Sequence, residues 1–150
     1  MDRLLPPAGR YAPLAHATNR LVSATRKVLV VGDVKAAMLQ PRAVYASMFD
    51  TPHLVHWVRG SPSAGRLLVK FRQRGIDAVF YNVGGAIYLK NHFGHYRYTD
   101  AQRRVLRSFW ERYLEPLHEI REGDDTVMGL YRVRRSPGPR LPLQLPGETS

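Results

Sequence analysis

The stretch Lys27-Val28-Leu29-Val30-Val31-Gly32-Asp33 decides the fold of this 150-residue chain. Four consecutive apolar residues, three of them β-branched, lead directly into Gly-Asp. A continuous apolar run that ends at a turn residue is typical of a strand buried on both faces of a sheet. Such sheets are covered by helices on both sides. The stretch therefore predicts the first strand of an α/β domain.

A second strongly apolar strand is predicted over 76–83, where the sequence reads IDAVFYNV. A helix is predicted between the two strands, with Ser61 as its N-cap, Pro62 at its first position and Gly75 at its end. A short strand over 43–47 precedes that helix. A strand, a crossover that contains a helix and another strand predict a right-handed βαβ unit.

The helix after this unit has a capping-box pattern, because Gln102 follows Thr99 by three residues. The remaining elements that we predict are, in chain order, a helix with Pro13 in its first turn that ends near Thr25, a short helix over 34–39, a segment over 53–58 that is helix or loop, one or two helical turns over 86–90, a loop over 91–98, and two strands over 117–122 and 127–134 joined by Gly123-Asp124-Asp125.

The fold class that follows is α/β: a single three-layer, Rossmann-like domain over 10–135. Its sheet is small and mostly parallel, and a C-terminal antiparallel hairpin extends it. Residues 1–9 contain Pro6 and Pro7 and are predicted to be a flexible lead-in. Residues 136–150 contain a proline every few positions and are predicted to be a disordered tail.

The chain is strongly basic, with 23 Lys and Arg against 12 Asp and Glu and a net charge of +11. This charge favours a polyanionic partner, although a solvated basic surface is the alternative. The absence of cysteine excludes disulfides, thiolate metal sites and cysteine nucleophiles. No apolar run approaches the ~20 residues needed to span a bilayer, and the N-terminus lacks the apolar centre of a signal peptide.

The best candidate for a ligand site is the pair of turns that follow the two apolar strands. Gly32 and Asp33 follow the first, and Asn82, Gly84 and Gly85 follow the second, so all five would face one crevice. The dinucleotide fingerprint needs three glycines, whereas Gly32 stands alone. Asp33 would place a negative charge where a phosphate should sit, and its alternative role is to cap the next helix. A nucleotide or nucleotide-sugar binder is therefore our second hypothesis.

Other arrangements do not predict catalysis. His53/His56 and His92/His95 form two His-x-x-His pairs, but zinc needs three or four ligands. The serines lack the strand-to-helix context of a nucleophile elbow, and Asp124-Asp125 lie at a hairpin tip. We predict no catalytic residue, no metal site and no cofactor.

The predicted helices carry basic faces at Arg66, Lys70, Arg103 and Arg107, which would favour an anionic surface. Aromatic residues alternate with basic ones over 90–104 and could stack on bases. No helix-turn-helix, zinc-finger or RNP-like motif accompanies them. A non-specific nucleic-acid binder is therefore the third hypothesis.

Several segments resemble one family when taken in order. The segments are Tyr11, Leu14 and Asn19 in the first helix; Lys27 to Asp33; Val44-Tyr45 with Phe49-Asp50; Leu67 to Asn82, including Gly-Ile-Asp-x-Val-x-Tyr-Asn; Tyr113 to Leu117; and Leu130 to Val133. This order resembles the soluble C-terminal, extracytoplasmic domain of bacterial lipid-linked-sugar glycosyltransferases with the GT-C architecture, the dolichyl-phosphate-mannose-protein mannosyltransferase-like family.

The resemblance implies a non-catalytic accessory domain, a fragment or a stand-alone relative, that acts by binding. In that family the acidic catalytic residues lie in loops of the membrane portion, so no catalytic residue carries over to this chain. The implied partners are the membrane part of the glycosyltransferase, the anionic membrane surface and a glycan. The domain would be extracytoplasmic and membrane-associated in such a parent, and cytoplasmic if expressed as written.

Overall fold

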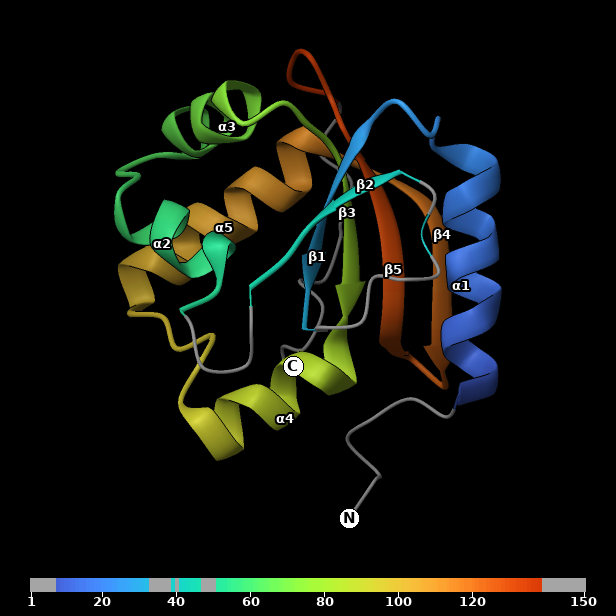
Figure 1. Ribbon diagram of the computed structural model, residues 1–150. Coiled ribbons are helices and arrows are strands. Elements are labelled where there is room, and N and C mark those ends of the chain that lie inside the picture. Colours follow the sequence, from blue (N-terminus) through green and yellow to red (C-terminus); the bar gives the residue numbers. More distant parts are fainter. Residues whose placement is uncertain (1–7, 33–38, 40, 47–50, 139–150) are drawn as a thin grey trace.

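The computed structural model describes residues 8–32, 39, 41–46 and 51–138, and its centre is a five-stranded mixed sheet (Figure 1). The strand order is β2-β1-β3-β5-β4. The strands are β1 (Lys27–Val31), β2 (Arg42–Val44), β3 (Ile76–Asn82), β4 (Leu114–Glu122) and β5 (Asp125–Val133). β1 pairs in parallel with β2 and β3, whereas β5 is antiparallel to β3 and β4. The predicted α/β class and the C-terminal antiparallel hairpin are confirmed.

Helices cover both faces of this sheet. They are α1 (Ala8–Leu21), α2 (His53–Arg59), α3 (Ala64–Gln73), α4 (Val83–Phe93) and α5 (Asp100–Tyr113). Figure 1 shows α1 on one face and α2, α3 and α5 on the other, while α4 lies below the carboxyl end of β3. None of these described helices is long and apolar enough to cross a bilayer.

The continuous apolar run in β1 is explained by burial on both sides of the sheet. Val28 and Val30 pack with Leu14 of α1 in one core cluster. Leu29 and Val31 pack in the other, beneath α2, α3 and α5. Because successive side chains of a strand point to opposite faces, a strand with two covered faces needs apolar residues at every position.

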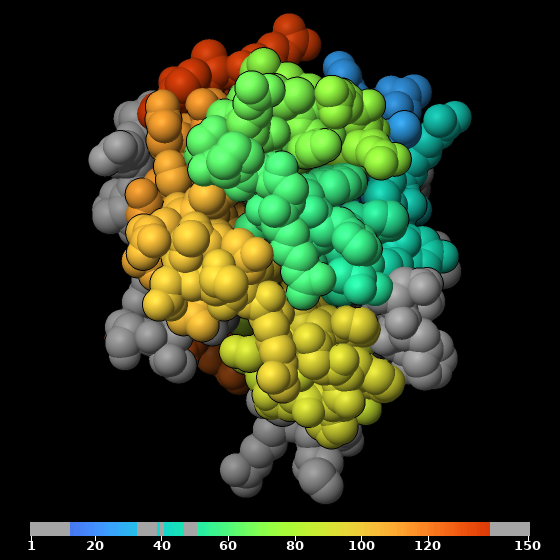
Figure 2. Space-filling model, turned by 90° about the vertical axis from the view of Figure 1, so that its left-hand side faces the viewer, coloured from blue at the N-terminus to red at the C-terminus, as the bar shows by residue number. Residues whose placement is uncertain are grey.

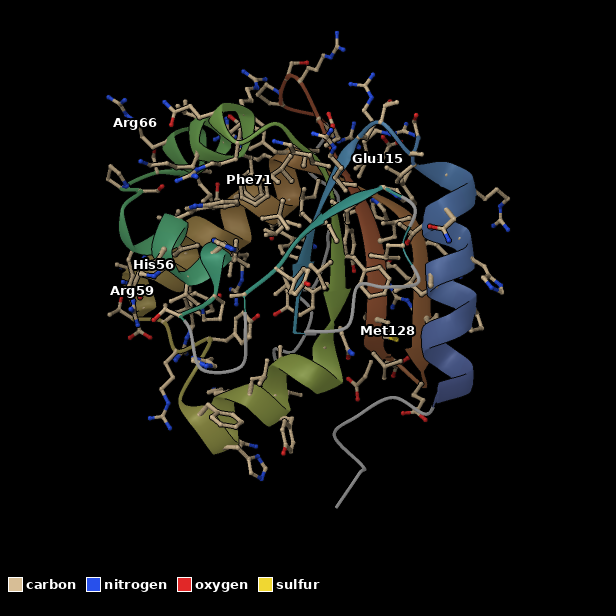
Figure 3. All side chains as sticks on the ribbon, viewed as in Figure 1. His56, Arg59, Arg66, Phe71, Glu115 and Met128 are labelled. Atoms are coloured by element: carbon tan, nitrogen blue, oxygen red, sulfur yellow. The ribbon has the colours of Figure 1, made fainter. Side chains whose placement is uncertain are left out.

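Aromatic side chains fill the cluster beneath α2, α3 and α5. Phe71 of α3 lies between the layers (Figure 3), and its ring centroid is 4.7 Å from that of Phe109 in α5. Trp110 packs edge-on against Tyr81 of β3 at 5.2 Å and against Tyr131 of β5 at 5.0 Å. These contacts fix α3 to α5 and α5 to the sheet.

Two helix starts differ from the prediction, one open alternative is resolved and one cap is confirmed. α3 is capped by Ser63, whose Oγ accepts from Arg66 N–H, while the Ser61 hydroxyl donates to Trp57 O at 2.6 Å. Pro13 lies inside α1, because α1 already begins at Ala8. The segment that is helix or loop in the sequence is α2. The capping box is confirmed, with Gln102 N–H donating to Thr99 Oγ1 at 3.1 Å.

The predicted boundaries of the elements that follow β3 were wrong. α4 begins at Val83 and extends into the predicted loop over 91–98 as far as Phe93, where Gly94 ends it with a φ of 72°. β4 begins at Leu114, directly after α5, and includes Pro116. A proline is tolerated there because β4 is an edge strand. Ser47, most of the predicted helix over 34–39, residues 1–7 and the tail from 139 onward lie outside the described residues.

Candidate functional site

Three of the predicted ligand residues, Gly32, Asn82 and Gly85, meet at the carboxyl ends of β1 and β3. Their backbones lie in direct contact. Asn82 caps α4, with its Oδ1 accepting from Gly85 N–H at 2.9 Å. A Cβ on Gly85 would overlap the carbonyl oxygen of Gly32. A Cβ on Gly32 would overlap the Asn82 carbonyl oxygen and lie 2.7 Å from Ala86 N. These glycines allow the first turn of α4 to pack directly on the end of β1.

The backbone N–H of Gly32, a donor that could bind a phosphate at this edge, already has a hydrogen-bond partner. Gly32, with a φ of 82°, donates its N–H to the Tyr96 hydroxyl at 2.9 Å. A nearby cavity, lined by residues that include His53, His95 and Tyr96, has a volume of about 10 Å³. That volume holds about one water molecule. Gly84 lies beside Gly85 in the first turn of α4, and Asp33 lies outside the described residues.

The four predicted surface cations lie on two neighbouring helices. Arg66 and Lys70 are exposed on α3, and Arg103 and Arg107 are exposed on α5. Figure 3 shows Arg66 pointing outward from α3, and Figure 2 shows α2, α3 and α5 close together on one face of the molecule. The Arg103 guanidinium already has partners within the chain. It donates to Tyr98 O at 3.5 Å, and its Nη1 lies 3.8 Å from Asp100 Oδ1.

The two histidine pairs lie on different elements, although His53 and His95 line the same small cavity. His53 and His56 lie on α2, whereas His92 lies at the end of α4 and His95 follows its C-cap. Within the described part of the chain, no group of three or more His, Cys, Asp or Glu side chains could hold a metal ion. His92 instead stacks on Tyr88, with ring centroids 4.1 Å apart.

One carboxylate lies largely buried on the hairpin. The Glu119 side chain is 17% exposed, and its Oε2 accepts from the Tyr131 hydroxyl at 3.0 Å and from the Thr126 hydroxyl at 3.2 Å. Arg121 lies 3.4 Å from Oε1. Burial, reinforced by the Glu119 charge, raises the pKa of Tyr131 far above its usual value. The donors around it make Glu119 a link between β4 and β5.

Sequence reasoning missed a larger groove at the opposite edge of the sheet, where β1 and β3 begin. The groove has a volume of about 390 Å³. Its lining residues are Leu21, Val22, Ser23, Arg26, Asp77, Ala78, Glu115, Leu117, Arg132, Val133, Arg134 and Arg135. They come from α1, β3, β4, β5 and the segments next to them, with Arg26 directly before β1, and Figure 3 shows Glu115 near this end of the sheet. The one available sequence signal was the run Arg132-Val133-Arg134-Arg135 at the end of a predicted strand.

Comparisons with known proteins assign no family to this chain. No family model, no curated protein and no solved structure matched the chain.

Proposed function

We propose that this chain is a non-catalytic binding domain that docks on an anionic surface through the outer faces of α3 and α5, as the accessory domain of a membrane glycosyltransferase. One observation carries the proposal: α2, α3 and α5, which form one face of the molecule, have eight basic and two acidic side chains. The basic residues are Arg59, Arg66, Lys70, Arg72, Arg103, Arg104, Arg107 and Arg112, and the acidic ones are Asp100 and Glu111.

The spacing of the basic residues suits a flat anionic partner. Arg66 and Lys70 are four residues apart on α3, as are Arg103 and Arg107 on α5, so each pair lies on one side of its helix. Each helix also carries a buried stripe that packs on the core, and Arg103 and Arg107 border that stripe on α5. A basic residue near an anionic membrane contributes about 1 kcal/mol. Four of them would raise the affinity about a thousandfold.

The resemblance of the sequence supplies the rest of the proposal. It implies that the domain acts beside the membrane part of a lipid-linked-sugar glycosyltransferase, with the bilayer surface or a glycan as the further contact. The chemistry would then lie in the parent enzyme, and this domain would hold it or its acceptor in place.

The test is sedimentation of the full chain with phosphatidylglycerol vesicles, at about 50 mM and about 500 mM salt, with phosphatidylcholine vesicles as the reference. We expect binding to the anionic vesicles at low salt that weakens at high salt. The double variant Arg66→Gln/Lys70→Gln should bind about 30-fold more weakly. The matched variant Arg20→Gln/Arg42→Gln, which removes two exposed arginines outside α3 and α5, should bind like the unmodified chain. Absence of binding at low salt would refute the proposal.

A Rossmann-like nucleotide or nucleotide-sugar binder is the second candidate, and the parallel order β2-β1-β3 favours it. In such sheets ligands bind outside the carboxyl ends of the strands, at the point where the strand order reverses. The contact between Gly32 and Gly85 weighs against it, because α4 occupies the space next to the end of β1. A thermal-shift screen of nucleotides and nucleotide-sugars decides the matter: a saturable shift that Asp33→Ala removes would favour this candidate.

A further inference from the structure

We propose that the groove at the amino ends of β1 and β3 binds a phosphate monoester, with the phosphate against Arg26, Arg132 and Arg134 and the apolar body against Leu21 and Leu117. This site is separate from the basic faces of α3 and α5 and does not depend on the function proposed for them.

Positive charge predominates in the groove. Four arginines line it, against the two carboxylates of Asp77 and Glu115. The C-terminal end of α1 also borders it and adds about half a negative charge. The sum leaves an excess of more than one positive charge, which suits a dianion.

The two ion pairs of the groove are loose. The closest nitrogen of Arg26 is 3.6 Å from Asp77 Oδ1, and that of Arg132 is 3.9 Å from Glu115 Oε2. Charge-assisted hydrogen bonds are about 1 Å shorter. Both guanidinium groups therefore keep N–H donors for a ligand, while the carboxylates hold them near the groove. Glu115 and Arg132 are directly opposite each other on β4 and β5, which fixes their spacing.

Arg134 is half-buried, whereas Arg26, Arg132 and Arg135 are exposed. The Nε of Arg134 is inaccessible to solvent and has no hydrogen-bond partner among the described residues. The residue is held in place, since its backbone N–H donates to Tyr113 O at 2.7 Å. The guanidinium lies close to the backbone of Gly138, where a Cβ would be 2.6 Å from Arg134 Cζ. An ordered guanidinium loses little entropy when it binds phosphate through its fork of donors.

The size and lining of the groove suit a ligand with an apolar body. Small-molecule sites are typically about 300–1,000 Å³, and this groove is about 390 Å³. Its apolar walls come from Leu21, Val22, Ala78 and Leu117. Inorganic phosphate would leave those walls in contact with water, so a monoester should bind more tightly.

The test is a titration of the full chain with phenyl phosphate, followed by calorimetry and by the Nε–Hε NMR signals of the arginines. We expect saturable binding, a shift of the Arg134 Nε–Hε signal, and affinity for inorganic phosphate about tenfold lower. Arg26→Gln and Arg132→Gln should each weaken binding about tenfold or more. Glu115→Gln should bind at least as tightly as the unmodified chain, because a competing carboxylate is removed.

The control is Arg20→Gln, which removes an exposed arginine outside the groove and should change the affinity less than about twofold. Competition by a sugar phosphate or by a short-chain phosphatidic acid would support the site and tell which class supplies the monoester. The proposal is overturned if phenyl phosphate does not saturate the chain up to about 10 mM, or if Arg20→Gln weakens binding as much as Arg132→Gln.

Discussion

A single methyl group added at Gly85 tests the backbone contact that joins α4 to the end of β1. Gly85 is the third residue of α4, and Gly65 is the second residue of α3, so both lie in the first turn of a helix. Neither has a positive φ. Replacing a helical glycine with alanine ordinarily stabilises a protein by about 0.5–1 kcal/mol. The two positions differ in what the new Cβ would meet.

At Gly85 the Cβ would overlap the Gly32 carbonyl oxygen and lie 2.9 Å from the carbonyl carbon and 3.1 Å from Asn82 Cγ. Two of these atoms are backbone and one belongs to the capping side chain, so none can move without displacing α4 or β1. Overpacking of this kind costs about 1–3 kcal/mol, and we place Gly85→Ala at the upper end. After the gain of alanine is subtracted, the free energy of unfolding should fall by about 2 kcal/mol.

At Gly65 the nearest atom would be Ser63 Oγ at 3.9 Å, so Gly65→Ala should raise the free energy of unfolding by up to about 1 kcal/mol. Urea unfolding monitored by tryptophan fluorescence measures both variants. The expected difference of about 3 kcal/mol corresponds to about 6–12 °C in Tm for a chain of this size. If the two variants differ by less than about 0.5 kcal/mol, the packing explanation of the glycines is refuted.

Two further predictions concern buried tyrosines. Tyr98→Phe removes a buried hydroxyl that has no hydrogen-bond partner among the described residues, so urea unfolding should show equal or slightly greater stability. Tyr131→Phe removes the donor to Glu119 and should lower the free energy of unfolding by about 1–3 kcal/mol. A greater loss of stability in Tyr98→Phe than in Tyr131→Phe would contradict this prediction. Burial raises the pKa of both tyrosines. Their contribution to stability is therefore intact below pH ~10 and is lost above it, by up to about 1.4 kcal/mol per pH unit for each tyrosine. Between about pH 8 and 11 the urea midpoint of Tyr131→Phe should therefore fall less than that of the unmodified chain. Equal slopes of midpoint against pH in the two proteins would argue against this prediction.

The sequence was sufficient for the elements whose signal is local. β1 and β3 were found to within one residue, because each contains a continuous apolar run that must be buried on both faces. The capping box at Thr99 is likewise local, since its two hydrogen bonds join residues three apart. The hairpin was found from its turn residues.

The parts that were missed depend on contacts between distant segments. Gly84 and Gly85 lower the intrinsic helix propensity, so the sequence favoured a break. The structure needs a glycine at 85 inside the helix because Gly32, more than fifty residues earlier, approaches it. Pro116 similarly suggested the end of an element, and only the place of β4 at the edge of the sheet makes it acceptable.

The groove could not have been predicted, because it depends on β5, and not β4, being the strand that pairs with β3. In a sheet with parallel strands alone, the residues that follow each strand would gather at the carboxyl edge, where Gly32 and Asn82 lie. β5 runs antiparallel to β3, with Ala78 opposite Arg132. The arginines at the end of β5 are therefore carried to the amino edge, beside Asp77 and Arg26. The position of the proposed phosphate site at the amino edge of β1 and β3 thus follows from the antiparallel hairpin. Because β5 runs opposite to β3, its last arginines lie at the end of the sheet opposite Gly32 and Asn82.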